Sequence, residues 1–155
     1  MKNEIEKKFL VVSASYKEMA NEKYKIKQGY ISETKKAVTR VRISNKDAYI
    51  TIKENKKEIS KLEFEYSIPI KEGLYLIENL CNDDIIMKTR YIVEFEGLQW
   101  EVDEFKGKNN GLVIAEIELE DESQKFRKPK WVGNEVTDDE RYYNVNLMMN
   151  PFQKW

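Results

Sequence analysis

Acidic and basic side chains recur at every second position in several short stretches of the chain. The first stretch contains Glu4, Glu6 and Lys8, and a later one contains Arg40 and Arg42. Side chains of a β-strand alternate between its two faces, so residues two apart point the same way. Arginine binds carboxylate or phosphate through paired hydrogen bonds, and carboxylate oxygens are ligands that hard divalent cations prefer. Facing an enclosed space, such residues would form a site for a phosphorylated ligand and a metal.

Charged residues take alternate positions in five further stretches, with apolar or aromatic side chains between most of them. An antiparallel sheet with one solvated face explains any single stretch of this kind. Recurrence from stretch to stretch, and the choice of arginine in a chain that otherwise prefers lysine, favour charged faces that turn inward. The residues are Lys53 in AYITIKE, Lys61, Glu63 and Glu65 in KLEFEY, Lys88 and Arg90 in MKTRY, Glu101 and Asp103 in WEVDEF, and Glu116, Glu118 and Glu120 in AEIELE.

Composition excludes several classes of function. The 155 residues suit one domain, and 27 basic against 28 acidic side chains argue against a general nucleic-acid or membrane-surface binder. There is no histidine, which excludes histidine-based triads and zinc sites with histidine ligands. The single cysteine, Cys81, follows an apolar run, so we expect it to pack in the core of a protein from a reducing compartment. Without a secretory or membrane-spanning segment, the expected location is the cytoplasm.

Alternation of apolar and polar residues predicts eight strands, most of them joined by short polar turns. Helices are expected after Ser15 and Thr137, each followed three residues later by glutamate as in a capping box, and after Pro69. The third helix is expected to present Tyr142, Val145 and Met149 on one stripe. The expected strands are 3–12, 24–34, 37–44, 47–54, 59–68, 85–96, 98–106 and 112–121.

These elements predict an α+β fold with a large antiparallel sheet. If the charged faces turn inward, the sheet would close into an eight-stranded antiparallel β-barrel with a charged lumen and a few covering helices. An eight-stranded barrel can enclose side chains or one small ligand. Many charges inside an empty lumen would be costly. Polyphosphate together with magnesium or manganese would complement both the basic and the acidic residues. The apolar faces would then point outward, where the three helices could cover them.

The order of the stretches along the chain is itself informative. They are ExExK at 4–8, QGY at 28–30, RxR at 40–42, TIK at 51–53, ExE at 63–65, KxR at 88–90, WxVDxF at 100–105, AEIEL at 115–119, EVTxDxRY at 135–142 and NP at 150–151. With this series the chain resembles the CYTH superfamily, or triphosphate tunnel metalloenzymes, and particularly its small bacterial single-domain members.

The resemblance implies one domain over residues 1–155, with a tunnel open at both ends that binds a triphosphate-containing small molecule. Expected phosphate ligands are Lys8, Arg40, Arg42, Lys53, Lys88 and Arg90. Expected ligands of one or two divalent cations, Mg²⁺ or Mn²⁺, are Glu4, Glu6, Glu63, Asp103, Glu116 and Glu118. Those expected to act in catalysis are Glu4, Glu6, Lys8, Lys53 and Arg90. Arg141 could close over the tunnel, or serve in helix capping or packing.

The function that the resemblance favours is metal-dependent hydrolysis of inorganic triphosphate, with nucleoside triphosphates as further substrates. Three alternatives stay open at this point: a thiamine triphosphatase, an adenylate cyclase and a non-catalytic polyphosphate- or nucleotide-binding module. The cyclase branch has a His-Phe motif upstream of ExExK, which this chain lacks. We expect no nucleic-acid or membrane partner, and either a monomer or a homodimer.

Overall fold

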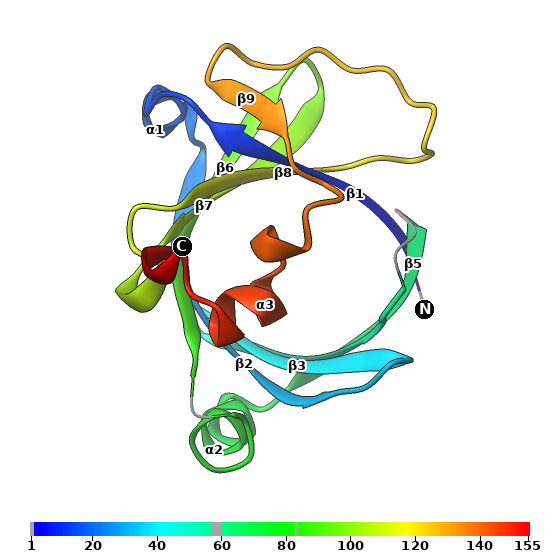
Figure 1. The fold of residues 1–155 in the computed structure, drawn as a ribbon, viewed down its shortest axis with the longest axis vertical. Coiled ribbons are helices and arrows are strands. Elements are labelled where there is room, and N and C mark those ends of the chain that lie inside the picture. The colour runs from blue at the N-terminus through cyan, green and yellow to red at the C-terminus, as the bar shows by residue number, and fades with distance from the viewer. Residues whose placement is uncertain (1, 57–59, 83) are drawn as a thin grey trace.

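The centre of the protein is a closed ring of eight antiparallel strands in the computed structural model, which describes residues 2–56, 60–82 and 84–155 (Figure 1). The ring runs β5-β4-β3-β2-β6-β7-β8-β1 and closes where β1 pairs with β5. This confirms the predicted fold class. The strands are β1 (Lys2–Val11), β2 (Glu22–Glu33), β3 (Ala37–Ser44), β4 (Asp47–Glu54), β5 (Ser60–Ile68), β6 (Ile86–Phe95), β7 (Leu98–Phe105) and β8 (Val113–Glu118).

Seven of these strands begin and end within two residues of their predicted bounds, although residue 59 lies outside the described residues. The prediction for β8 was too long, because the chain turns soon after Glu118 and Asp121 accepts a hydrogen bond from the backbone of Ser123. A ninth strand, β9 (Val132–Glu135), was not predicted; it pairs with β1 beside Phe9. This strand has only four residues and no clear alternation, so it gave no periodic signal.

Both predicted capping boxes are wrong. Ser15 lies in the right-handed helical region before α1 (Tyr16–Met19), and its side chain makes no capping hydrogen bond. Thr137 instead accepts a hydrogen bond through Oγ1 from the backbone nitrogen of Lys8, at 3.1 Å. In both places a tertiary or local contact replaces the cap. The helix predicted after Pro69 is confirmed as α2 (Ile70–Asn79).

Apolar side chains cover the outside of the barrel, as predicted for Ile5 and Phe9. These two residues are buried in a cluster with Trp100 and Trp131 on the outer side of the strands. The irregular chain from 119 to 131, rather than a helix, completes this cover beside β9, while α2 packs outside β3 and β4 (Figure 1). Two of the three predicted helices therefore cover the barrel from outside, but the third does not.

The C-terminal segment lies across one end of the barrel (Figure 1). There, Leu147 is fully buried against Tyr30, Ile86 and Ile114, which occupy lumen-facing positions of their strands. Buried Asn109 fixes the segment by donating to the carbonyl of Leu147. The tunnel expected to be open at both ends is thus narrowed at this end. The segment contains η2 (Glu140–Tyr142), α3 (Asn144–Met149) and η3 (Phe152–Lys154), and Asn109 belongs to η1 (Gly107–Asn109).

The stripe predicted for the last helix is also wrong. Met149 is 70% exposed, and Tyr142 belongs to η2 rather than to α3. Leu147 and Met148 are the buried residues of α3. Because α3 begins seven residues after Thr137, a different set of its residues faces the core than a helix starting at Thr137 would present. Among the described residues, no helix is long and apolar enough to cross a membrane.

Replacing Gly29 with alanine is expected to destabilise the barrel. A Cβ atom at Gly29 would lie 2.8 Å from the Cβ of Cys81 and 2.9 Å from the Cδ1 of Ile85. Overpacking of this kind costs about 1–3 kcal/mol. Thermal and denaturant unfolding should show this loss of stability for Gly29→Ala. Cys81→Ala should lose less, because it removes the thiol but keeps the Cβ atom of residue 81 beside the backbone of Gly29. An unchanged melting temperature for Gly29→Ala would contradict the close packing.

Candidate active site

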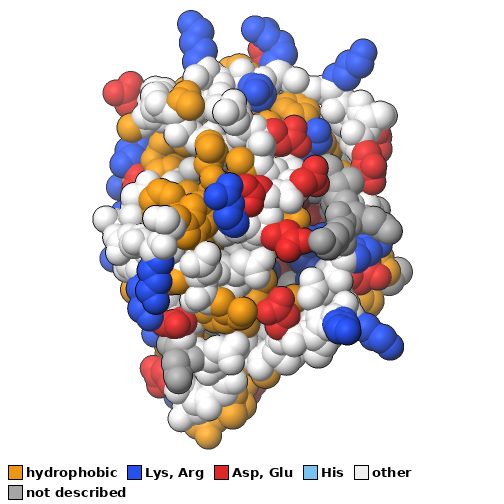
Figure 2. All heavy atoms as spheres, viewed as in Figure 1, with side chains coloured by type: hydrophobic (Ala, Val, Ile, Leu, Met, Phe, Trp, Pro, Cys, Tyr) orange, Lys and Arg blue, Asp and Glu red, His pale blue; other side chains and the backbone are white. Residues whose placement is uncertain are grey.

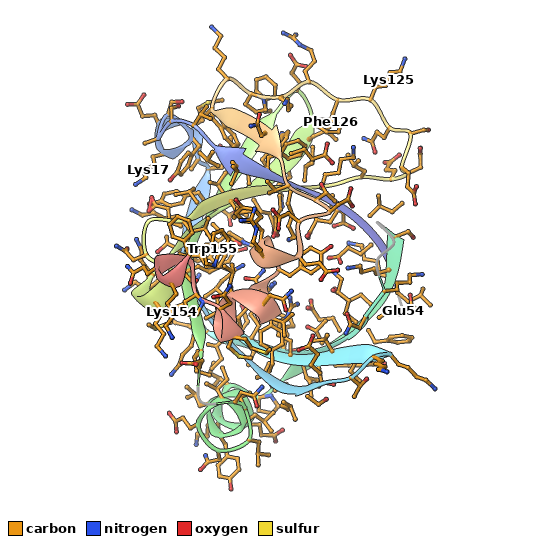
Figure 3. The ribbon with its side chains drawn as sticks, in the orientation of Figure 1. Lys17, Glu54, Lys125, Phe126, Lys154 and Trp155 are labelled. Carbon is orange, nitrogen blue, oxygen red and sulfur yellow. The ribbon has the colours of Figure 1, made fainter. Side chains whose placement is uncertain are left out.

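The barrel encloses a cavity of about 460 Å³ whose walls are charged. Figure 3 shows side chains filling the space inside the ring of strands, and Figure 2 shows a hollow on this face with acidic side chains gathered around it. Among the described residues, six basic and six acidic ones line the cavity. They are Lys8, Arg40, Arg42, Lys53, Lys61 and Arg90, and Glu4, Glu6, Glu54, Glu101, Glu116 and Glu118.

Strand register places these charges beside one another. Lys8 of β1 is directly opposite Glu116 of β8, and Arg40 of β3 is opposite Thr51 of β4. Paired residues in an antiparallel sheet share a face. Each alternating stretch of the sequence therefore contributes its charged face to one interior, as predicted.

One wall of the cavity is built around the ammonium group of Lys8. This group donates to Glu6 at 2.7 Å and also to Glu116. Burial raises the pKa of Glu6, and the neighbouring carboxylate of Glu116 raises it further. Burial also opposes ionisation of Glu116, yet Lys8 and other nearby cations hold its pKa well below the ordinary value. Two carboxylates are thus held close together by a single lysine.

Behind this wall lies a buried ion cluster made of Lys88, Arg90 and Asp103. Arg90 donates through Nε to Oδ1 of Asp103 at 2.7 Å and through Nη2 to Oδ2 at 2.8 Å. Lys88 donates to the same carboxylate and to Oδ1 of Asn144, the latter at 3.3 Å. Burial lowers the pKa of Lys88 to about 8, although Asp103 favours its charged form. Neither Lys88 nor Asp103 exposes side-chain area, and only Arg90 of the three lines the cavity.

We call Arg40, Arg42 and Arg90 the arginine group. Burial lowers the pKa of Arg42 to about 10, and repulsion from the other two arginines lowers it as well. Within the described residues Arg42 forms no ion pair, and its Nε donates only to Oε1 of buried Gln28 at 3.3 Å. The Nε of Arg40 is buried without a hydrogen-bond partner. Arg40 lies 3.4 Å from Glu65, and Arg90 has several carboxylate partners. Arg42 is therefore the poorly compensated cation, and an anion beside it would be stabilised.

We call Lys8, Lys53 and Lys61 the lysine group. Lys53 pairs with Glu4, and its Nζ lies 4.0 Å from Glu63. Burial lowers the pKa of Lys61, and repulsion from Lys53 and Lys8 adds to this effect. The sequence analysis did not select Lys61 as a site residue, although it shares a strand face with Glu63. That shared face was the signal by which it could have been found.

Nine of the twelve residues expected at the site line the cavity. The exceptions are Glu63, Lys88 and Asp103, which lie outside the lining. Residues that line it without having been selected include Thr51, Lys61, Glu101, Tyr143 and Asn144.

Glu120 and Arg141 also lie away from the cavity. Glu120 is exposed beyond the end of β8. Arg141 pairs with Asp139 at 2.6 Å and lies over the rings of Tyr142 and Trp155. Its observed contacts are therefore those of a packing residue in the C-terminal segment, rather than of a group that closes over the tunnel.

The acidic residues fit a divalent cation in their chemistry. Carboxylate oxygens are what hard cations bind, and a divalent cation held by Glu6 and Glu116 would relieve the repulsion that, after burial, raises the pKa of Glu6. Among the described residues, however, no three acidic or sulfur- or imidazole-bearing side chains converge as a ready-made metal site. Lysine and arginine neutralise these carboxylates in the structure. The acidic residues are therefore of the right chemical type to bind a divalent cation.

Comparisons with known proteins agree with this geometry. A family model described as "CYTH domain" matches residues 2–145. The chain is 50% identical over 155 residues to a protein of Acetivibrio thermocellus named inorganic triphosphatase, covering 100% of this chain and 99% of the relative. It is 30% identical to a protein of the same name from Nitrosomonas europaea, covering 95% and 97%. A crystal structure of an inorganic triphosphatase matches with a TM-score of 0.67 at 30% identity, covering 96% of each chain.

Replacing Arg42 with methionine is expected to stabilise the protein while weakening anion binding. The substitution removes a poorly compensated cation and keeps an apolar stem of similar length, so the free energy of unfolding should rise by about 1 kcal/mol. Thermal shift assays should show a higher melting temperature for Arg42→Met and a smaller stabilisation by added inorganic triphosphate than in the wild type. A lower melting temperature with undiminished stabilisation by triphosphate would contradict the role assigned to the arginine group.

Proposed function

Because the chain belongs to the CYTH domain family, we propose that it is an inorganic triphosphatase that works inside its barrel with a divalent cation. Two relatives that match almost the whole chain bear that name, which supports the proposal. The observation that carries it is the arginine group at the cavity wall, in which Arg42 forms no ion pair within the described residues and the Nε of Arg40 has no hydrogen-bond partner. The reaction converts triphosphate and water into pyrophosphate and orthophosphate.

Charge balance supports the need for a divalent cation. The twelve charged residues that line the cavity include equal numbers of cations and carboxylates. A triphosphate alone would add several negative charges to this balanced space, which is unfavourable in an enclosed site. A triphosphate that enters with a divalent cation adds far less net charge. The equal numbers thus favour a ligand that contains both signs of charge.

The arginine group is proposed to bind the phosphoryl oxygens. Arg90 is the best placed of the three, since Asp103 fixes its guanidinium through two hydrogen bonds and leaves it at the cavity wall. Arg42 would gain the anionic partner that it lacks, and Arg40, which lies 3.4 Å from Glu65, would gain a second one. The ammonium groups of Lys8 and Lys53 lie beside carboxylates and would neutralise other oxygens of the triphosphate. Phosphoryl transfer depends mainly on such positioning and charge neutralisation.

The carboxylates proposed to hold the cation are Glu4, Glu6, Glu116 and Glu118, all of which line the cavity. When bound, Mg²⁺ or Mn²⁺ supplies neutralisation of phosphoryl oxygens and a more acidic water. Glu63 is left as a second neighbour of Lys53, at 4.0 Å. No covalent nucleophile is required, which agrees with a chain that has no histidine and whose one cysteine has its pKa raised by burial.

Asp103 and Lys88 are assigned positioning roles in place of direct contact with metal and substrate. The carboxylate of Asp103 is fully buried and is occupied by Arg90 and Lys88. Removing it would leave two buried cations without their partner. These residues would therefore act through Arg90. A cytoplasmic location is proposed as well, because the single cysteine suits a reducing compartment.

A substrate panel tests the function. Purified protein with Mg²⁺ or Mn²⁺ should release orthophosphate from inorganic triphosphate, and a chelator should abolish the release. ATP, thiamine triphosphate and pyrophosphate complete the panel and separate the other readings of the sequence. Absence of phosphate release from every compound with either metal would overturn the proposal and leave a binding module.

The Asp103 assignment predicts a different result from loss of a metal ligand. Glu116→Gln should raise the Mg²⁺ concentration needed for half-maximal activity at least tenfold. Asp103→Asn should leave that concentration within about twofold of the wild type while raising KM for triphosphate. It should also lower the free energy of unfolding by about 3–5 kcal/mol, as expected when one partner of a buried ion pair is removed. A shift in Mg²⁺ dependence equal to that of Glu116→Gln would instead make Asp103 a metal ligand.

A further inference from the structure

Lys61 is a half-buried cation of the cavity wall. It lies on β5 directly opposite Glu4 of β1. Glu4 pairs with Lys53, and among the described residues no carboxylate lies within 4.0 Å of the ammonium group of Lys61. Lys8 and Lys53 each have a carboxylate partner, so Lys61 is the least neutralised member of the lysine group.

The contact that holds Lys61 comes from the C-terminal segment. Its ammonium group lies 5.0 Å from the centre of the Tyr143 ring, at the start of α3. A tyrosine ring attracts a cation only weakly compared with a phosphate oxygen. The hydroxyl of Tyr143 donates to the carbonyl of Thr137 at 3.2 Å, and Thr137 accepts from the backbone of Lys8. The ring is therefore tied to β1 while it faces Lys61.

Lys61 and Arg42 have different charged neighbours, although Lys8 and Arg90 both contact Glu116. The charges that act on Arg42 are those of Arg40, Arg90, Asp103 and Glu101. Those that act on Lys61 are Lys53, Lys8, Glu6 and Glu140, the last of which belongs to the C-terminal segment. A linear chain of phosphoryl groups could contact both the lysine group and the arginine group at once, whereas a shorter anion could be held by the arginine group alone.

We propose that Lys61 is a further substrate-binding residue, which forms with Lys53 and Lys8 a subsite for one end of a linear triphosphate beside α3, and that Tyr143 positions it. This inference rests on the proposed function, because it assigns a part of the same cavity. The phosphoryl group supplies the anionic partner that Lys61 lacks. The Tyr143 ring keeps the side chain directed into the cavity before the phosphate arrives.

The test compares ligands of two lengths. Lys61→Met keeps the length of the side chain and removes its charge, and it should weaken inorganic triphosphate binding about tenfold by calorimetry and raise KM to a similar extent. Pyrophosphate, which the arginine group can hold by itself, should lose less than twofold. Lys61→Arg should retain most of the affinity, and Lys61→Gln should repeat the loss if the methionine variant does not fold. Lys125→Met makes the same charge change on the exposed chain between β8 and β9 and serves as the control.

Tyr143 is tested through its dependence on Lys61. Tyr143→Leu should raise KM for triphosphate about threefold with kcat nearly unchanged, and Tyr143→Phe should behave like the wild type. In the double variant with Lys61→Met, the leucine substitution should add nothing, since the residue that it positions is gone. An additive effect would make Tyr143 merely structural.

The subsite is overturned if Lys61→Met binds triphosphate as tightly as the wild type, or if it loses triphosphate and pyrophosphate equally. Both results can be obtained by calorimetry whether or not the protein turns over its ligand. Failure of the proposed function is seen separately, as absence of phosphate release by the wild type.

Discussion

Confinement of charge is the constraint on which the rest of this structure depends. Twelve lysine, arginine and glutamate side chains of the described residues share one cavity in the barrel. Ions in an enclosed space lose hydration and feel one another strongly. Lys8 and Asp103 reduce the cost of this confinement, because each binds two oppositely charged residues. Where the pairing is incomplete, at Arg42 and Lys61, the structure retains unfavourable repulsion that a ligand can relieve.

The packing of the protein is inverted to make this confinement possible. Because the strands direct their charged faces inward, the apolar faces lie outside and need cover. Trp100, Trp131 and Phe9 form that cover on one side, and α2 forms it on another. Part of the stability therefore comes from outside the barrel, which leaves the charged part of the lumen free to keep a costly arrangement. Such a division between a stabilising shell and a strained site is expected of a binding centre.

The C-terminal segment connects the two regions. Leu147 packs in the apolar end of the lumen, while Tyr143 and Asn144, at the start of the same helix, contact Lys61 and Lys88. The segment thus belongs partly to the core and partly to the site. Its attachment through Asn109 and Thr137 makes the position of the helix depend on the barrel.

The strands and most of the charged lining could be predicted from the residues alone, and the family resemblance supplied the closed barrel. Alternation is a local property, so ExExK at Glu4 and RxR at Arg40 could be read without any knowledge of neighbours. α1 begins directly after Ser15, as predicted, but the side-chain caps predicted at Ser15 and Thr137 are wrong, because a neighbouring side chain or a distant backbone group bonds the hydroxyl that local rules assign to a cap.

Which charged side chains reach the cavity depends on tertiary contacts that the residue pattern does not show. Lys88 and Asp103 have the same alternating pattern as Arg90, yet they are buried behind it because Asp103 binds both cations and α3 covers Lys88. Lys61 faces the cavity because β5 closes the ring against β1. Strand period fixes the face on which a side chain lies. Its depth and its partners depend on closure of the barrel and on where the C-terminal helix packs.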